Sequence, residues 1–231
     1  MNITVLTTHT IHHRFFIDKL NRCKKIGSIF LEQKSIKPKF DNSSPYEQKE
    51  KEFEEKKFDF DDVYPNCPIF EFESINNADA IRQINKVKPD IGIVFGTGKL
   101  SDQVIESFPL LMNVHRGIPE SYRGIDSELW AIKNEDYQNI GTTIHEVESD
   151  LDTGQIIAQE HLKLEKNMRI HQLRYYTTKI AINLCIESIE SFSKGKLELK
   201  PQKNKGEYFS FMGRDLKKKM EYQFNNHCSN L

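Results

Sequence analysis

MNITVLTTHTIHHRFFIDKLNRCKKIGSIFL, residues 1–31, is the stretch that decides the fold class. Residues 1–8 are apolar and rich in β-forming side chains, which predicts a buried strand. Apolar residues between positions 11 and 23 recur near helical spacing, and residues 27–31 predict a second strand. A strand, a helix and a strand in this order indicate an α/β protein with a parallel sheet.

The same alternation continues along the chain. Further strands are predicted at 67–72, 90–96 and 110–115, helices at 77–87 and 103–107, and two paired β segments at 140–148 and 154–162. A long amphipathic helix is predicted over 168–192, followed by short β-like pieces and a charged, frayed end. We therefore expect a Rossmann-like domain with a mostly parallel sheet over residues 1–165. Residues 166–231 would add the long helix and a small C-terminal extension that contains β structure.

Residues 34–62 interrupt this pattern with two prolines, a polar turn cluster and densely mixed charge. Glu and Lys recur at one-turn spacing in the second half of the segment, as they do in a solvated helix. We expect an exposed insertion here. An RNA-binding role would need a basic excess, which the interleaved acidic residues remove.

Composition limits the class of protein. The 231 residues are 37% hydrophobic with a formal net charge of −1, which gives no basic field for nucleic acid. The sequence has neither a secretory signal nor an apolar run of the roughly 20 residues that a membrane span needs. We therefore expect a cytoplasmic protein that binds no nucleic acid and no membrane. Its four scattered cysteines form no CxxC pair, and its histidines lack ligand spacing, so we expect no metal.

Two polar residues follow each other at the end of the predicted strand 110–115, LLMNVH. Asn113 and His115 alternate, so both side chains point to the same side of the sheet. Ligands of open α/β sheets bind beyond the carboxyl ends of the strands, where an Asn and a His can donate to a carbonyl oxygen and manage a proton. Asp152 in ESDLDTGQII is suited to orient such a His. Taken alone, a strand-end His is more often structural, and a DTG triplet is typical of ordinary turns.

Two stretches together resemble the catalytic domain of the formyltransferase family: MNVHRGIPESYRGIDSELWAI (residues 112–132) and NIGTTIHEVESDLDTGQIIAQ (residues 139–159). The shared signature is an Asn-x-His, a Tyr-x-Gly turn, a Gly-Thr-Thr-x-His strand and an Asp-x-Gly, in this order. The family includes glycinamide ribonucleotide formyltransferase, methionyl-tRNA formyltransferase and the sugar N-formyltransferases. The resemblance implies that 10-formyl-tetrahydrofolate donates a formyl group to an amine.

The resemblance also implies roles for individual residues. Asn113 would hydrogen-bond the formyl oxygen, His115 would stabilise the developing oxyanion and move protons, and Asp152 would orient and charge-stabilise His115. His145 is interpreted as structural support. The folate carrier would lie against two loops, through Gly96, Thr97, Gly98, Lys99, Leu100, Glu148 and Asp150.

Within the family, the sequence is most similar to the sugar N-formyltransferases, which act on nucleotide-linked amino sugars. The residues after Asp152 leave little room for the C-terminal barrel of a methionyl-tRNA enzyme. The purine enzyme's glycine-rich phosphate loop is replaced by THTIHHRFF. The implied acceptor is a dTDP-linked amino-dideoxy sugar for O-antigen of lipopolysaccharide or a similar glycan. Acceptor contacts are expected from His12, His13, Arg14, Arg116, Tyr122 and Arg123, because cationic and donor groups at a helix start suit a diphosphate.

Several alternatives stay open. His12 and His13 also fit an ordinary polar helix start, and Arg116 and Arg123 also fit a role in fixing loops. Tyr208 and Phe211 are candidates for stacking on a base or sugar, whereas Trp130 is expected in the core. The chain could instead be a methionyl-tRNA or purine formyltransferase, a formyl-tetrahydrofolate deformylase, or a catalytically silent binder of folate or nucleotide sugar. A homodimer is a further hypothesis.

Overall fold

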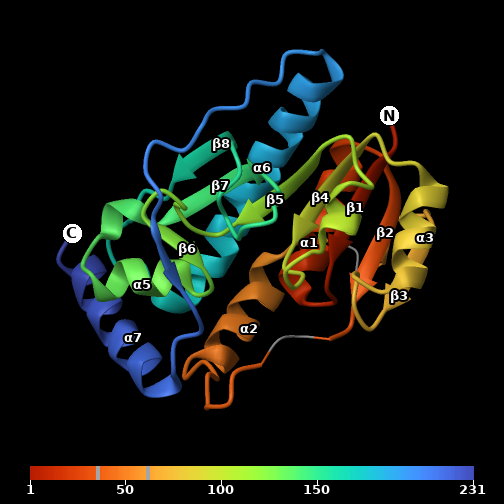
Figure 1. Cartoon of the computed structure of the whole chain (residues 1–231). Helices are drawn as coiled ribbons and strands as arrows, with labels where there is room; N and C mark the ends of the chain where they lie inside the picture. The colour runs from red at the N-terminus through yellow and green to blue at the C-terminus, as the bar shows by residue number, and fades with distance from the viewer. Residues whose placement is uncertain (35–36, 61–62) are drawn as a thin grey trace.

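The computed structural model of the chain describes residues 1–34, 37–60 and 63–231, so positions 35–36 and 61–62 of the predicted charged segment lie outside the described residues. Over these residues, seven strands form one sheet in the order β3-β2-β1-β4-β5-β7-β8 (Figure 1). The strands are β1 (Ile3–Thr7), β2 (Ile26–Glu32), β3 (Ile69–Phe72), β4 (Ile91–Phe95), β5 (Leu111–His115), β7 (Gly141–Glu146) and β8 (Ile156–His161).

The β1-to-β5 part of this sheet is parallel. β1 lies between β2 and β4 and is parallel to both, and β5 is parallel to β4. β7 and β8 then add an antiparallel pair at one edge. The predicted mostly parallel α/β sheet and the predicted pair of β segments are therefore confirmed.

Helices cover both faces of the sheet, so neighbouring residues of a central strand pack in two different cores. Val5 of β1 packs into the core beneath α1 (Ile11–Cys23) and α6 (Leu173–Ser193). Leu6 packs on the opposite face, beneath α3 (Ala78–Val87) and α4 (Asp102–Ile105). Burial on both faces explains the continuous apolar runs of the central strands.

The described residues of the charged segment between β2 and β3 are mostly exposed or half-buried, and its second half forms a helix, but one face of that helix is buried. Its helix α2 (Glu47–Lys57) packs against the 3₁₀ helix η2 (Ile170–Gln172) and α6. Glu54 is fully buried and accepts hydrogen bonds from Arg174 Nε (2.7 Å) and Nη2 (2.8 Å). A mixed-charge pattern looks solvated in sequence because the buried partner, Arg174, lies more than a hundred positions away.

The chain end is also more ordered than predicted. Residues after the short strand β9 (Glu207–Phe209) form a helix, α7 (Arg214–Ser229), instead of a frayed end. Met220, Phe224 and Cys228 recur every fourth residue and are buried in a further core, which they share with α5 (Ser127–Lys133) and which we call the α5–α7 core. Their stripe is hard to see in sequence because charged residues surround it.

The extension returns across the carboxyl-terminal side of the domain. β9 pairs in parallel with β6 (Tyr122–Gly124), which confirms the predicted β structure in the extension. At the start of α7, Lys217 Nζ donates to the Asn42 carbonyl (3.0 Å) and Arg214 Nη1 donates to Ser43 Oγ (2.7 Å). The extension and the segment before α2 therefore hold each other in place.

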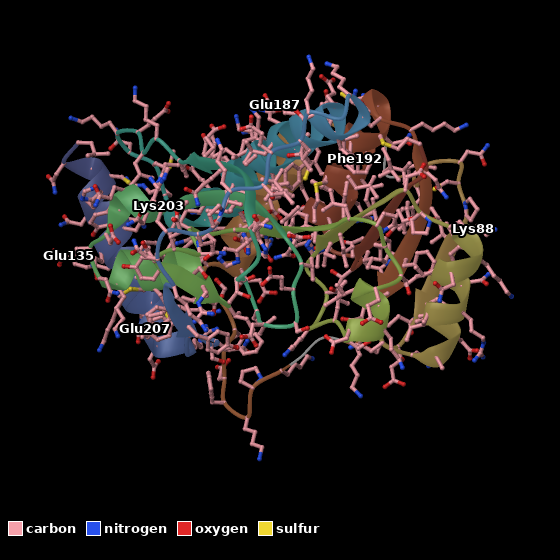
Figure 2. The ribbon with its side chains drawn as sticks, turned by 45° about the horizontal axis from the view of Figure 1, so that its top comes forward. Lys88, Glu135, Glu187, Phe192, Lys203 and Glu207 are labelled. Carbon is pink, nitrogen blue, oxygen red and sulfur yellow. The ribbon has the colours of Figure 1, made fainter. Side chains whose placement is uncertain are left out.

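The molecule is elongated along the sheet. Lys88, after α3, and Glu135, after α5, lie at opposite ends of the view in Figure 2. A short 3₁₀ helix, η1 (Tyr137–Asn139), follows α5 at the Glu135 end. In the part of the chain that the structure describes, no helix is both long enough and apolar enough to cross a membrane.

We expect Phe224→Ala to lower the free energy of unfolding by about 3–5 kcal/mol, because it empties a fully buried site between α7 and α5. Tyr222→Ala on the same helix is the control: Tyr222 is 76% exposed, and its loss should change stability by less than about 0.5 kcal/mol. Urea unfolding followed by circular dichroism measures both. Equal effects of the two substitutions would mean that α7 is not part of the folding unit.

Candidate active site

A cavity of about 640 Å³ lies beyond the carboxyl ends of β1, β4 and β5. Asn113 and His115 reach it from β5, His145 from β7, and Asp152 from the turn before β8. This is the edge of an open α/β sheet at which ligands bind. The three residues predicted to be catalytic are therefore brought together.

Asp152 is the residue that joins the others. Its Oδ2 lies 3.4 Å from His115 Nδ1, and its Oδ1 lies 3.4 Å from Asn113 Nδ2. The backbone amide of Gly124 donates to Oδ2 at 2.7 Å. The Gln202 side-chain amide donates to the backbone carbonyl of Asp152 at 2.9 Å, so the C-terminal extension fixes this turn.

The carboxyl of Asp152 stays charged although it is buried. Burial by itself would raise its pKa, but the positive character of His115 and His145 and the Gly124 amide together hold the pKa well below its usual range. A hydrogen-bonded, ionised carboxylate beside an imidazole stabilises the imidazolium form of that ring. Asp152 can therefore support a positive charge on His115.

The His115 ring is held at both nitrogens. Nε2 lies 3.0 Å from the carbonyl oxygen of Tyr122, to which it donates, and Nδ1 faces Asp152. Because both neighbours are acceptors, the ring donates to both only as imidazolium. Gly117 makes room for it, since a Cβ at that position would lie 2.6 Å from Nε2.

His145 has more contacts than sequence reasoning assigned to it. Its Nδ1 donates to the Glu146 carbonyl (2.7 Å), and its Nε2 lies 3.1 Å from Asn113 Nδ2. The same Nε2 lies 3.3 Å from Asp152 Oδ1. His145 is the cross-strand partner of Asn113 in the antiparallel β5–β7 pair. That register, once known, would have identified His145 as the residue that orients Asn113.

All seven residues predicted to contact the carrier line the cavity. Gly96 has a φ of +85°, and a Cβ there would collide with the His13 ring, so only glycine fits easily. Sequence reasoning missed the residue that holds this loop. Glu32, 5% exposed at the end of β2, accepts hydrogen bonds from the Gly98 amide (2.7 Å) and the Ile75 amide (2.9 Å).

His12 and His13 line the cavity. Burial, together with the nearby Arg116 and Arg174, lowers the pKa of His13 to about 3. Burial and His13 lower the pKa of His12 as well. The hydroxyl of Thr10 lies 2.8 Å from His13 Nδ1. Both rings are therefore neutral, and they offer hydrogen bonds instead of charge.

The other predicted acceptor residues divide into two groups. Arg116 lines the cavity, whereas Arg14, Tyr122 and Arg123 lie outside its lining. The Tyr122 hydroxyl donates to Asp136 Oδ2 (3.1 Å), and Arg123 Nε donates to the Gly206 carbonyl (2.7 Å). Tyr122 therefore joins β6 to the turn after α5, and Arg123 joins β6 to the extension.

The aromatic residues lie largely where they were expected. Tyr208 and Phe211 of the extension line the cavity, and Tyr208 is 49% exposed. Trp130 packs beside the α5–α7 core, stacks on Phe209 and donates to the Ser210 carbonyl at 2.9 Å. Tyr208 and Phe211 are thus available for a flat ligand, and Trp130 supports the segment that carries them.

A charged wall of the cavity was not predicted. It contains Glu50 of α2, Arg116, Glu128 of α5 and Arg174 of α6. Glu50 Oε2 lies 2.8 Å from Arg174 Nη1, and Glu128 Oε2 lies 3.7 Å from Arg116 Nη1. No local sequence pattern joins these four elements. Within the described residues, no group of three His, Cys, Asp or Glu side chains is arranged to hold a metal ion.

The sequence is similar to that of known formyl transferases. Residues 19–189 match the sequence model of the formyl transferase family. A methionyl-tRNA formyltransferase from Kosmotoga olearia is 29% identical over 137 residues, which is 58% of this chain and 44% of that protein. The chain thus spans less than half the length of the curated relatives it matches.

Solved structures show the same fold. A 4-N formyltransferase from Francisella tularensis superposes with a TM-score of 0.63 at 18% identity, over 90% of this chain and 76% of that one. HypX from Aquifex aeolicus in complex with tetrahydrofolic acid superposes with a TM-score of 0.63 at 17% identity, over 94% of this chain and 30% of that one.

The neutral state of His13 makes stability depend on pH. Unfolded histidine has a pKa of about 6.5, so acid favours the unfolded chain as the pH falls from that value toward the folded pKa of about 3. Between pH 7 and pH 5 this contribution removes about 2 kcal/mol of stability. We expect His13→Gln to lose about 2 kcal/mol less than the wild type over this interval.

Urea unfolding at pH 7, 6 and 5 measures this dependence. His9→Gln is the matched control, because His9 lies on the same segment with its side chain 46% exposed, and it should keep the wild-type pH dependence. If His13→Gln also kept it, the neutral state of His13 would be disproved.

Proposed function

Because this chain belongs to the formyl transferase family, we propose that it transfers the formyl group of 10-formyl-tetrahydrofolate to the amino group of a nucleotide-linked amino sugar. The observation that carries the proposal is the convergence of Asn113, His115 and Asp152 at one end of a cavity. The same cavity is bounded by the loop of residues 96–100 on one side and by the extension on another.

The donor supplies a formyl carbon, which the acceptor nitrogen attacks. In this proposal Asn113 donates a hydrogen bond to the formyl oxygen as negative charge develops there, and the imidazolium of His115 stabilises the same charge. The nitrogen–carbon bond to the acceptor forms, the bond to the carrier nitrogen breaks, and one proton passes from the acceptor to the carrier. His115 gives a proton to the carrier nitrogen and then takes one from the acceptor nitrogen, which restores the charged ring that Asp152 stabilises.

The surface around the cavity supports a small, partly aromatic acceptor. Tyr208 and Phe211 offer ring faces for a base or a sugar, and the Arg116 guanidinium is suited to a phosphate. The formal net charge of −1 does not favour a polynucleotide acceptor. In this proposal the acceptor is a dTDP-linked amino-dideoxy sugar.

Methionyl-tRNA is the second candidate acceptor, because the relative from Kosmotoga olearia is a methionyl-tRNA formyltransferase. The two candidates differ in one measurable respect. A tRNA acceptor requires phosphate contacts along an acceptor stem, so its rate would fall steeply with salt.

The test is a mass-spectrometric assay with 10-formyl-tetrahydrofolate and three acceptors: dTDP-linked amino sugars, methionyl-tRNA and glycinamide ribonucleotide. A mass gain of one formyl group on an amino sugar alone is expected. Transfer to methionyl-tRNA or glycinamide ribonucleotide would replace the sugar assignment. Formate release without any acceptor would favour a deformylase, and bound folate without either product would favour a silent binder.

His115→Ala should reduce the transfer rate by at least about 100-fold, because it removes the proton relay. Tetrahydrofolate binding should stay within about twofold of the wild type, since the residues predicted to contact the carrier (96–100, Glu148 and Asp150) do not include this ring. His161→Ala provides the control, because His161 is exposed on β8 and hydrogen-bonds only the Gln138 carbonyl. Transfer by His115→Ala at the control's rate would contradict the assigned role.

Glu32→Gln should raise the Kd for tetrahydrofolate by about tenfold, because the Gly98 amide loses a charged acceptor and the carrier loop loses its shape. The transfer rate at saturating carrier should change little. Glu73→Gln is the matched control, since Glu73 is 74% exposed and, among the described residues, its side chain pairs with Lys34 alone. Calorimetric titration measures the Kd values, and equal values in the two variants would exclude a positioning role for Glu32.

A further inference from the structure

The charged wall, Glu50, Arg116, Glu128 and Arg174, has no part in the transfer step described above. All four side chains line the same cavity as Asn113 and His115. They come from α2, the turn after β5, α5 and α6, so four separate elements place charge on one surface. Such a surface has a definite preference for the sign of a ligand's charge.

The wall itself has two carboxylates and two guanidinium groups, and the buried Glu54 behind it adds a third carboxylate. Arg174 alone serves two carboxylates, Glu50 at 2.8 Å and Glu54 at 2.7 Å. Arg116 has Glu128 as its carboxylate neighbour, at 3.7 Å. Counting the buried Glu54, three carboxylates therefore face two guanidinium groups.

The neighbouring positive group does not correct the imbalance. Lys217 Nζ lies 3.1 Å from Asp126 Oδ2, so its charge is neutralised by its own partner. Burial is the main reason that the pKa of Glu50 rises to about 7. Arg174 and Arg116 oppose this rise, and Glu54 and Glu128 add to it.

Glu128 is an independent sign that this wall awaits a donor. The residue is 8% exposed and lines the cavity, yet its Oε1 is buried without a hydrogen-bond partner among the residues that the structure describes. A buried carboxylate oxygen without a donor is costly, and a donor group on a bound ligand would remove that cost.

The wall also begins beside the reacting group. A Cβ on Gly117 would lie 2.6 Å from His115 Nε2 and 2.7 Å from the Cβ of Ser127. The start of α5, where Ser127 precedes Glu128, thus packs around the same glycine as the imidazole. Glu128 itself lies 3.7 Å from Arg116, the residue that follows His115 in the chain.

We propose that Glu128 and Glu50 form a subsite for the ammonium group of the acceptor, in the same cavity as His115. The ammonium gives one proton to a carboxylate of this subsite and becomes the neutral amine that attacks the formyl carbon. An ammonium group carries three donors and one positive charge, which matches an unpaired carboxylate oxygen and a single excess of negative charge. This inference rests on the proposed function for the identity of the acceptor.

The test compares two ligands that differ only in the amine. They are dTDP-linked 4-amino-4,6-dideoxyglucose and dTDP-linked 6-deoxyglucose, titrated calorimetrically into protein loaded with tetrahydrofolate. The wild type should bind the amino sugar at least about tenfold more tightly. In Glu128→Gln and Glu50→Gln this preference should fall to about twofold or less, while the Kd for tetrahydrofolate stays unchanged.

Two glutamate-to-glutamine controls match these variants. Glu55→Gln lies on the outer side of α2 with its side chain 52% exposed, and Glu135→Gln lies just after α5 at the end of the molecule (Figure 2). Both should keep the wild-type preference for the amine. An equal preference in Glu128→Gln and in Glu135→Gln would overturn the subsite.

The outcomes also separate this inference from the proposed function. If neither nucleotide sugar binds the wild type, the sugar assignment fails. The comparison is then repeated with the methyl ester of methionine and that of the corresponding hydroxy acid. A preference for the amine that disappears in Glu128→Gln supports the subsite with a different acceptor, and no preference in the wild type overturns it.

Discussion

The arrangement of the site depends on one buried carboxylate. Asp152 faces His115 and Asn113 and accepts a hydrogen bond from the Gly124 amide, so it connects the end of β5, the turn before β8 and β6. A buried anion is tolerated only when such partners surround it. The backbone around it is equally constrained, because Asp152 has a φ of +55° and Gln202 of the extension binds its carbonyl.

The strands and most helices were predictable from sequence because their signals are local. The apolar run of β4 and the helical spacing of α1 each reveal their element within a few residues. The same holds for Asn113 and His115, whose alternation on one strand places both side chains together. Asp152 was a candidate from its residue type, and the resemblance strengthened it, since the turn that brings it to His115 has no periodic signal.

The residues that sequence reasoning missed all depend on partners far away in the chain. Glu54 looks solvated until Arg174, 120 positions later, is placed beside it. Glu32 gains its role only when the turn at Ile75 and the loop at Gly98 meet at the end of β2. His12 and His13 have the composition of a cationic helix start, but burial keeps them neutral. A residue that is ionisable in the sequence stays charged in the folded protein only where its side chain remains hydrated or has a partner of opposite charge.

The late return of the chain has a consequence for synthesis. Tyr208, Phe211 and Lys217 form one side of the cavity, and the packing of α7 in the α5–α7 core holds this segment in place. Domains emerge from the ribosome amino-terminal end first. A nascent chain can therefore complete its sheet and assemble Asn113 with His115 while one side of the cavity is still missing. The growing protein presents an open surface to its ligands until residues 207–217 have been translated and packed.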